Sequence, residues 1–241
     1  MPEREPGGDP RTVGMRHMSL PEAIADELRE RIIEGVLPTG ARLVERELAE
    51  QLQVSRIPMR EAIVQLEVEG LVRRLPRRGA MVSTLTSADV TDLFDVHESL
   101  DALAAGLAAE RADETNLALL RRHVDQATEA AAAGQTAQLA KINVAFHIAV
   151  VTASGSPLLS SAMRQVHGRL QLLFRLTSSV SSDPTLVCAE HVQIFTAIAS
   201  GNRAEAERLA RAHAVKNRES TLAIVRELES SSPQTPDRDG G

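Results

Sequence analysis

Residues 45–82 decide the fold of the amino-terminal part of this chain, and they read ERELAEQLQVSRIPMREAIVQLEVEGLVRRLPRRGAMV. An amphipathic segment from Glu45 to Leu52 is followed by a tight link, and a second helical pattern begins at Ser55, a good helix N-cap. We expect Gly70 to end that helix, and two β-prone runs then flank a Pro-Arg-Arg-Gly turn. Helix, turn, helix and basic hairpin in this order are typical of a winged helix-turn-helix that reads DNA.

The chain before this stretch completes one small domain. Leu20 and Pro21 open a helical pattern with one apolar stripe, and Gly35 ends it. Residues 20–82 therefore have the size and element order of one DNA-binding domain. Apolar contacts around the second helix of the motif are expected from Ile57, Ala62, Ile63, Leu66 and, beyond the helix, Leu71.

The composition of the whole chain indicates a soluble, mainly helical protein. Its 241 residues suggest two domains, and 43% hydrophobic residues are ample for packed cores. With only 2% aromatic residues, the cores must be aliphatic, which suits helices. No stretch resembles a signal peptide or the roughly 18 consecutive apolar residues of a membrane span, so we expect a cytoplasmic protein without a membrane partner.

Charge is distributed unevenly along the chain. The net charge is −6, yet residues 55–82 carry six Arg against three Glu. From residue 86 onward there are 14 Lys and Arg against 19 Asp and Glu. The positive charge is concentrated on the candidate reading segment, which favours DNA binding by a defined face rather than by a basic coat.

The rest of the chain has a helical pattern without strand-like alternation. Residues 83–87 form a short polar linker, and Ser87 is expected to cap the next helix with Asp89 in its first turn. The expected fold class is mostly α, with the winged helix-turn-helix followed by an all-α antiparallel helical bundle. We expect helices near 88–111, 114–133, 136–153, 157–179, 184–200 and 203–229. The expected division is a disordered N-terminus (1–17), a DNA-binding domain (18–84), a helical domain (87–229) and a disordered tail (230–241).

The first turns of the second helix carry the side chains expected to touch DNA. Arg56 and Arg60 are four residues apart and share one helix face. Arginine suits a bidentate contact with guanine or phosphate, although surface arginines are often only solvated. The predicted DNA-contacting residues are Arg46, Ser55, Arg56, Ile57, Pro58, Arg60 and, at the wing tip, Arg77 and Arg78.

The segment GVLPTGARLVERELAEQLQVSRIPMREAIVQLEVEGLVRRLPRRGAMV resembles the winged-helix domain of the GntR family of bacterial transcription regulators. The resemblance implies DNA contacts from Arg46, Ser55, Arg56, Arg60 and, in the wing, Gly79. The chain differs from the family pattern at the residue after Arg56, where a Thr is common. One winged helix reads only a few base pairs, so a homodimer on a near-palindromic operator in double-stranded DNA is expected.

Four residues of the helical part have a spacing that suits a metal ion. Asn143 and His147 are four residues apart and share one helix face. His191 lies ten residues before Gly201 and His213 twelve after it, so the two imidazoles are level in a hairpin that turns at Gly201. Three imidazoles and one oxygen suit a divalent ion such as Zn²⁺ or Ni²⁺. Histidines with purely structural roles remain the alternative.

The stretches DLFDVHESLDALAAGLAAERA, NVAFHIAVVTASGSPLL and EHVQIFTAIASGNRAEAERLARAHAVKN resemble the FCD effector domain of FadR-type GntR regulators. The resemblance implies that residues 87–229 bind an effector and dimerise, with Asn143, His147, His191 and His213 at the metal-ligand positions. Many members have Asp in place of the Asn. His97 stands where the family usually places an Arg that meets an anionic effector, and Arg175 is a candidate substitute.

These observations predict a DNA-binding transcription regulator, a repressor in the commoner family behaviour, controlled by a small organic acid and a divalent metal. Enzyme motifs such as a P-loop, HExxH or G-x-S-x-G are missing from the sequence, so no enzymatic activity is expected. Two alternatives remain open at this point. One is a metalloenzyme domain with a DNA-binding appendage, and the other is a constitutive DNA binder with structural histidines.

Overall fold

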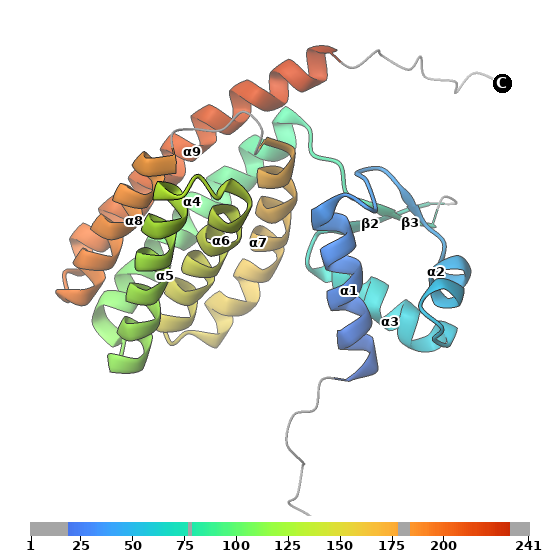
Figure 1. The fold of residues 1–241 in the computed structure, drawn as a ribbon, viewed down its shortest axis with the longest axis horizontal. Coiled ribbons are helices and arrows are strands. Elements are labelled where there is room, and N and C mark those ends of the chain that lie inside the picture. Colours follow the sequence, from blue (N-terminus) through green and yellow to red (C-terminus); the bar gives the residue numbers. More distant parts are fainter. Residues whose placement is uncertain (1–18, 77–78, 178–183, 232–241) are drawn as a thin grey trace, which may run out of the picture.

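The chain folds into two lobes, a small winged-helix lobe and a larger helical bundle (Figure 1). The structure is a computed structural model and describes residues 19–76, 79–177 and 184–231. The expected fold class, a winged helix-turn-helix followed by an all-helical domain, is confirmed.

The small lobe combines helices with a three-stranded antiparallel sheet in the order β1-β3-β2. Strand β3 is central, pairing Met81 with Arg42 on one side and with Arg73 on the other. The elements of this lobe are α1 (Leu20–Glu34), β1 (Arg42–Leu43), α2 (Glu45–Gln51), α3 (Arg56–Val68), β2 (Val72–Leu75) and β3 (Gly79–Val82).

Local sequence signals account for the boundaries of these helices. Helix α1 begins with a capping box, in which the Ser19 backbone N–H donates to the Glu22 carboxylate at 2.8 Å while the Ser19 hydroxyl accepts from the Glu22 N–H. Gln53 has a φ of 54° and makes the tight turn between α2 and α3. Gly70, with a φ of 75°, follows the end of α3 as expected, because glycine adopts this conformation without strain.

Two expectations about these segments are wrong in detail. Ile57 points outward with 74% of its surface exposed, and Met59 occupies the buried position of that first turn instead. The cap of the helix after the linker is Thr86 rather than Ser87, because the Thr86 hydroxyl accepts from the Asp89 N–H. Thr86 and Asp89 form a second capping box, one residue earlier than the sequence pattern predicts.

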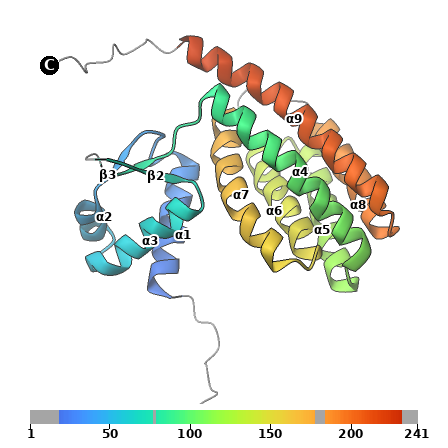
Figure 2. The same cartoon turned by 180° about the vertical axis from the view of Figure 1, so that it is seen from behind.

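The bundle consists of antiparallel helices with a long pair, α4 and α9, lying side by side along one face (Figure 2). Its elements are α4 (Ser87–Arg111), α5 (Glu114–Ala132), α6 (Thr136–Ala153), α7 (Pro157–Thr177), α8 (Pro184–Ala199) and α9 (Arg203–Ser231). The expected disordered segments lie outside the described residues, except that Ser230 and Ser231 are helical in α9. The expected start of the tail at residue 230 is therefore wrong.

Among the described helices, α6 is apolar and long enough to cross a membrane by composition alone, with a hydropathy of 1.2 over 18 residues. Core helices of soluble proteins share this composition. In this fold α6 packs against α4, α5 and α7. By composition α6 could therefore cross a membrane, which was not expected of any segment of this sequence. Its packing, however, is that of a helix in the bundle.

Helix α7 belongs to both lobes. Leu172 is fully buried in the apolar core of the small lobe, whereas Leu170 and Leu173 are buried in the core of the bundle. The backbone of α7 also touches the end of α3, because a Cβ placed on Gly168 would lie 2.1 Å from the Glu69 carbonyl oxygen. Only glycine permits this approach, so the two lobes are packed directly against each other.

We predict that Gly168→Ala destabilises the protein by about 1–3 kcal/mol, the usual cost of overpacking, although alanine favours a helix. The measurement is urea unfolding followed by circular dichroism. Gly106→Ala is the matched control, because the three atoms nearest to its Cβ would all belong to the Glu207 side chain, the closest being Oε1 at 2.3 Å. A flexible side chain can move and a helix backbone cannot. An equal loss of unfolding free energy in the two variants would therefore contradict this account.

Candidate DNA interface and effector site

The amino-terminal end of α3 presents exposed polar and cationic groups. Ser55 occupies the N-cap position, but its hydroxyl makes no capping hydrogen bond. Arg60 is one turn further along and 61% exposed, and its Nε donates to Glu45 Oε2 at 3.1 Å. Such an exposed pair contributes only about 0–1 kcal/mol, so a phosphate can replace the carboxylate at little cost.

Other predicted contact residues lie on the same surface. Arg56 and Ile57 are exposed in the first turn of α3, and Pro58 beside them is half-buried. Arg46 on α2 is 69% exposed and approaches Glu50 only to 4.0 Å. An isoleucine exposed on a reading helix is suited to apolar contact with a thymine methyl group.

The wing supplies a further edge of this surface. Gly79 opens β3 with a φ of 78° and has open space around it. Arg77 and Arg78 lie outside the described residues. Sequence reasoning did not single out Arg73 and Arg74, which are exposed on β2 next to the wing tip.

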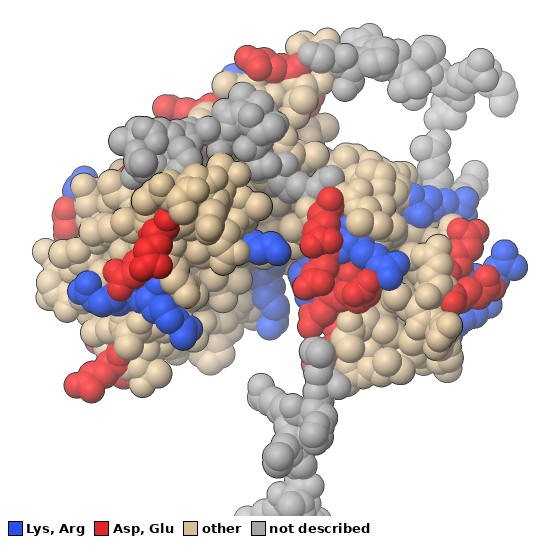
Figure 3. Space-filling view, in the orientation of Figure 1, with Lys and Arg blue, Asp and Glu red and all other residues tan. Residues whose placement is uncertain are grey.

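Figure 3 shows mixed groups of Lys or Arg and Asp or Glu over the face in view, without a continuous basic surface. The cations of α2, α3 and β2 are therefore the ones to consider for a DNA contact.

The second candidate site is a group of imidazoles inside the bundle. His147 on α6, His191 on α8 and His213 on α9 are all buried, and one ligand atom of each lies within 4.8 Å of the others. His191 Nε2 lies 3.4 Å from His213 Nε2, so the expected level pairing across the α8–α9 hairpin is correct. Two ligands bound tetrahedrally at about 2.0–2.1 Å from one ion are about 3.3–3.4 Å apart. The donor types and spacing therefore fit a divalent metal ion.

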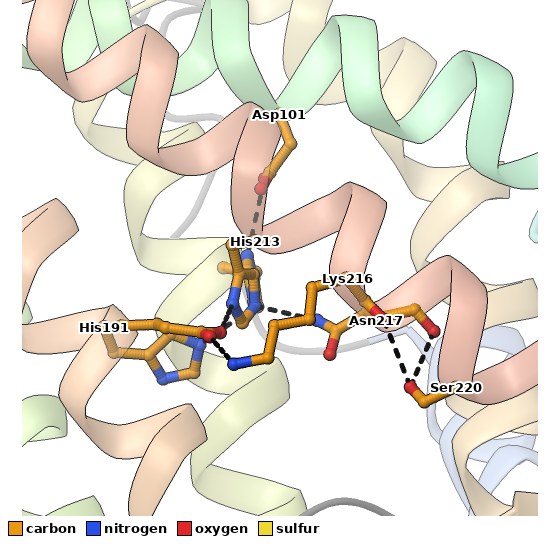
Figure 4. Close-up of polar contacts among 8 residues, drawn as sticks. Asp101, His191, His213, Lys216, Asn217 and Ser220 are labelled. Atoms are coloured by element: carbon orange, nitrogen blue, oxygen red, sulfur yellow. Dashed lines mark hydrogen bonds and ion pairs between the residues drawn. The ribbon is translucent and has the colours of Figure 1, made fainter.

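Polar neighbours fix the orientation of His213 (Figure 4). Its Nδ1 lies 2.7 Å from Glu190 Oε2, and Glu190 also pairs with Lys216. The Asn217 amide donates to His213 Nε2 at 2.9 Å. Glu190 assigns the proton to Nδ1, which is the arrangement of a metal-binding imidazole with an outer carboxylate. The Nε2 lone pair accepts from Asn217, so a metal ion at Nε2 would replace that hydrogen bond.

A carboxylate that sequence reasoning missed lies beside this cluster. Asp101 on α4 is buried, and its Oδ1 is 3.4 Å from His147 Nδ1 and 4.0 Å from His97 Nε2. Its spacing of four residues from His97 places both on one face of α4. That spacing was the available signal, since His97 itself was predicted to face the effector.

Burial sets the protonation of these groups. Burial lowers the pKa of His97 to about 4 and that of His167 to about 4, and it also lowers the pKa values of His191 and His213. Burial disfavours the Asp101 carboxylate, but the neighbouring His147 imidazole outweighs that and holds the pKa of Asp101 below its ordinary value. At neutral pH these four histidines are neutral, which is the state of imidazole that binds a metal ion.

Asn143 lies beside His147 along a small cavity, and its Oδ1 is buried without a hydrogen-bond partner among the described residues. An unpartnered buried oxygen is consistent with a role as ligand for an absent ion. His167 and Asn217 also line this cavity, which sequence reasoning did not foresee. The Arg175 position is on α7, but its side chain lies outside what the structure describes.

The cavity is narrow in this conformation. It leaves about 10 Å³ for the centre of a water-sized sphere, which is roughly what one water molecule needs. An ion or a water fits, whereas a larger organic ligand requires movement of the walls. The lining residues are His97, Asn143, Val144, His147, His167, Leu170, Phe174 and Asn217.

The fold and the exposed reading helix define a winged-helix DNA-binding protein with a second, all-helical domain. Two family descriptions match the chain, "Bacterial regulatory proteins, gntR family" over residues 20–82 and "FCD domain" over residues 92–216. The chain belongs to the GntR family of bacterial regulators, in the group that carries an FCD domain. It is a DNA-binding transcription regulator and not an enzyme, which removes the metalloenzyme alternative.

Relatives agree with this assignment. The HTH-type transcriptional regulator LutR of Bacillus subtilis (strain 168) is 31% identical over 203 residues, covering 76% of this chain and 92% of LutR. The solved structure of E. coli McbR/YncC is similar with a TM-score of 0.73 at 21% identity, covering 88% of this chain and 100% of that one. The solved structure of a GntR transcriptional regulator from Rhodococcus sp. RHA1 is similar with a TM-score of 0.68 at 25% identity, covering 84% of this chain and 97% of that one.

We predict that the metal-free protein loses stability as the pH falls from about 6.5 to about 4. In this window His97 binds a proton in the unfolded chain, with a pKa of 6.5, but not in the folded one, with a pKa of about 4. Stability rises with pH wherever the unfolded state binds more protons. Between pH 7 and pH 5, His97 alone accounts for roughly 2 kcal/mol of the free energy of unfolding.

Urea unfolding at both pH values in a chelating buffer measures this loss. His97→Leu removes the titrating ring and fills its space. Between pH 7 and pH 5 this variant should therefore lose less free energy of unfolding than the parent, by roughly 2 kcal/mol. The same pH dependence in the variant and the parent would contradict the assignment to His97.

Proposed function

We propose that this regulator is a homodimeric repressor whose affinity for its operator is controlled by a small organic acid, bound with a divalent metal ion in the helical domain. The observation that carries the proposal is the convergence of His147, His191 and His213, from three different helices, in the bundle interior. Their burial, and the lowered pKa values of His191 and His213, suit metal binding. Asn143 would add a neutral oxygen, and Zn²⁺ or Ni²⁺ are the ions that these donors suit best.

The organic acid would complete the metal coordination. With the three nitrogens and the Asn143 oxygen as donors, an ion with more than four ligands would keep a position open for a carboxylate of the effector. His97 and Arg175 are the proposed effector contacts beside the metal, since His97 lines the same cavity. Because the cavity now holds little more than an ion, effector binding would move its walls, and α7 contributes His167, Leu170 and Phe174 to them.

Movement of α7 provides the route to the DNA-binding lobe. Leu172 on the same helix packs in the core of the small lobe, and Gly168 touches the end of the reading helix at Glu69. A shift of α7 would therefore change the position of α3 relative to the bundle. A coupling of about 1–3 kcal/mol would change DNA affinity roughly 5- to 150-fold.

The proposed division of the chain is a DNA-binding domain at 18–84 and an effector-binding and dimerisation domain at 87–229. Two reading heads are needed because one winged helix contacts only a few base pairs, so the operator would be near-palindromic. We place the protein in the bacterial cytoplasm, where its relatives among transcription regulators act on DNA.

We predict that Arg56→Ala weakens specific operator binding by about 1–3 kcal/mol if Arg56 contacts a base. The side chain is exposed on the first turn of α3, and it makes no ion pair within the described part of the chain. Fluorescence anisotropy on specific and unrelated duplexes, over a range of salt concentrations, separates a base contact from a phosphate contact. Arg122→Ala removes the same charge from exposed α5 and should leave operator affinity unchanged.

We predict a graded loss of zinc affinity in variants around His213. Glu190→Gln should cost roughly 10- to 100-fold, as outer partners of metal ligands do, and His213→Ala should cost more. Competition with a chromophoric chelator measures both, and His123→Ala on α5 is the control outside the cluster. Wild-type affinity in His213→Ala would remove His213 from the ligand set.

A further inference from the structure

A second group of possible ligands adjoins the three-histidine cluster. His97 and Asp101 from α4 and His147 from α6 are all buried, and one ligand atom of each lies within 4.8 Å of the other two. The two groups share His147, but Asp101 and His97 do not belong to the first group. They lie on the side of His147 where Nδ1 faces the Asp101 carboxylate.

The second group has an unusual number of unsatisfied polar atoms. Both ring nitrogens of His97 and the Oδ1 atom of Asp101 are buried and have no hydrogen-bond partner among the described residues. His97 is only 2% exposed, so solvent does not reach it. Each unpaired buried polar group destabilises the fold. A bound species that contacts these atoms would remove that cost.

The alternative role for Asp101 is to orient His147, as Glu190 orients His213. The two carboxylates differ in geometry, since Glu190 lies 2.7 Å from His213 Nδ1 whereas Asp101 lies 3.4 Å from His147 Nδ1 without forming a hydrogen bond. An orienting role also leaves both nitrogens of His97 unexplained. A shared ion accounts for the longer Asp101 distance and pairs one of the two His97 nitrogens.

The two distances from the Asp101 carboxylate are within the range for such an ion. Asp101 Oδ1 is 3.4 Å from His147 Nδ1 and 4.0 Å from His97 Nε2. Ligand atoms at about 2.0–2.1 Å from one ion are about 3 Å apart at right angles and about 4 Å apart when opposite. Two imidazole nitrogens and one carboxylate oxygen form a donor set for divalent transition metals such as Zn²⁺ or Co²⁺.

We propose that His97, Asp101 and His147 form a second binding position for a divalent transition metal, next to the three-histidine position and in the same domain. The inference rests on the proposed function in that His147 is shared with the metal site proposed there. In this second position Asp101 supplies an anionic ligand, which the neutral Asn143 side chain does not provide. A neutral imidazole has one free lone pair, so the two positions compete for His147.

The competition suggests a test in which the first position is removed. In the full-length double variant His191→Ala with His213→Ala, we expect about one equivalent of Co²⁺ or Zn²⁺ to remain bound, measured by equilibrium dialysis and by the visible absorption of Co²⁺. Adding Asp101→Asn, which keeps the side-chain shape, should weaken this remaining binding at least 10-fold. Adding His97→Leu, which fills the space of the ring, should do the same.

The reverse variant separates this inference from the proposed function. His97→Leu with Asp101→Asn leaves the three-histidine position intact, and its failure to bind metal would overturn that position alone. The second position is overturned if the His191→Ala, His213→Ala variant is folded by circular dichroism and binds no metal. It is equally overturned if the remaining binding is unaffected by Asp101→Asn and by His97→Leu. If the variant His191→Ala with His213→Ala does not fold, the variant His191→Leu with His213→Leu, whose side chains fill the space of the rings, is used in the same measurement.

Discussion

Glu69, at the end of the reading helix α3, is held from two directions. Its carboxylate accepts two hydrogen bonds from the Arg29 guanidinium of α1, at 2.7 and 2.8 Å, and these join the two main helices of the small lobe. Its carbonyl oxygen lies against Gly168 of α7, so closely that no side chain fits between them. Bidentate pairing of this kind fixes orientation as well as distance. The end of α3 is therefore tied both to its own lobe and to the bundle.

The contact with Gly168 matters because residues of α7 pack in the cores of both lobes. Leu172 packs with the winged-helix residues, while Leu170 and Phe174 line the cavity near His147. Packed interiors respond to a shift by moving whole elements, since close packing leaves little room for local adjustment. A change in the contents of the cavity therefore has a short physical path to the reading helix.

The bundle interior contains polar groups that its own contacts leave unsatisfied. His97, Asp101 and Asn143 each have a buried nitrogen or oxygen without a hydrogen-bond partner in the described residues. An aliphatic core would be more stable without them, because burying polar atoms is unfavourable unless they are paired. Their presence, beside the buried imidazoles of His147, His191 and His213, is the strongest reason to expect that the domain binds an ion and a polar ligand.

Local patterns in the sequence determined the winged helix, the helical bundle, the exposed face of Arg56 and the level pairing of His191 with His213. These features follow from helix period, caps and turns, which act over a few residues, and from the length of one hairpin. Only the tertiary structure placed Asp101 beside His147, His167 in the cavity wall and Leu172 in the core of the other lobe. Helix spacing shows which residues share a face, but the order in which helices pack decides what that face meets.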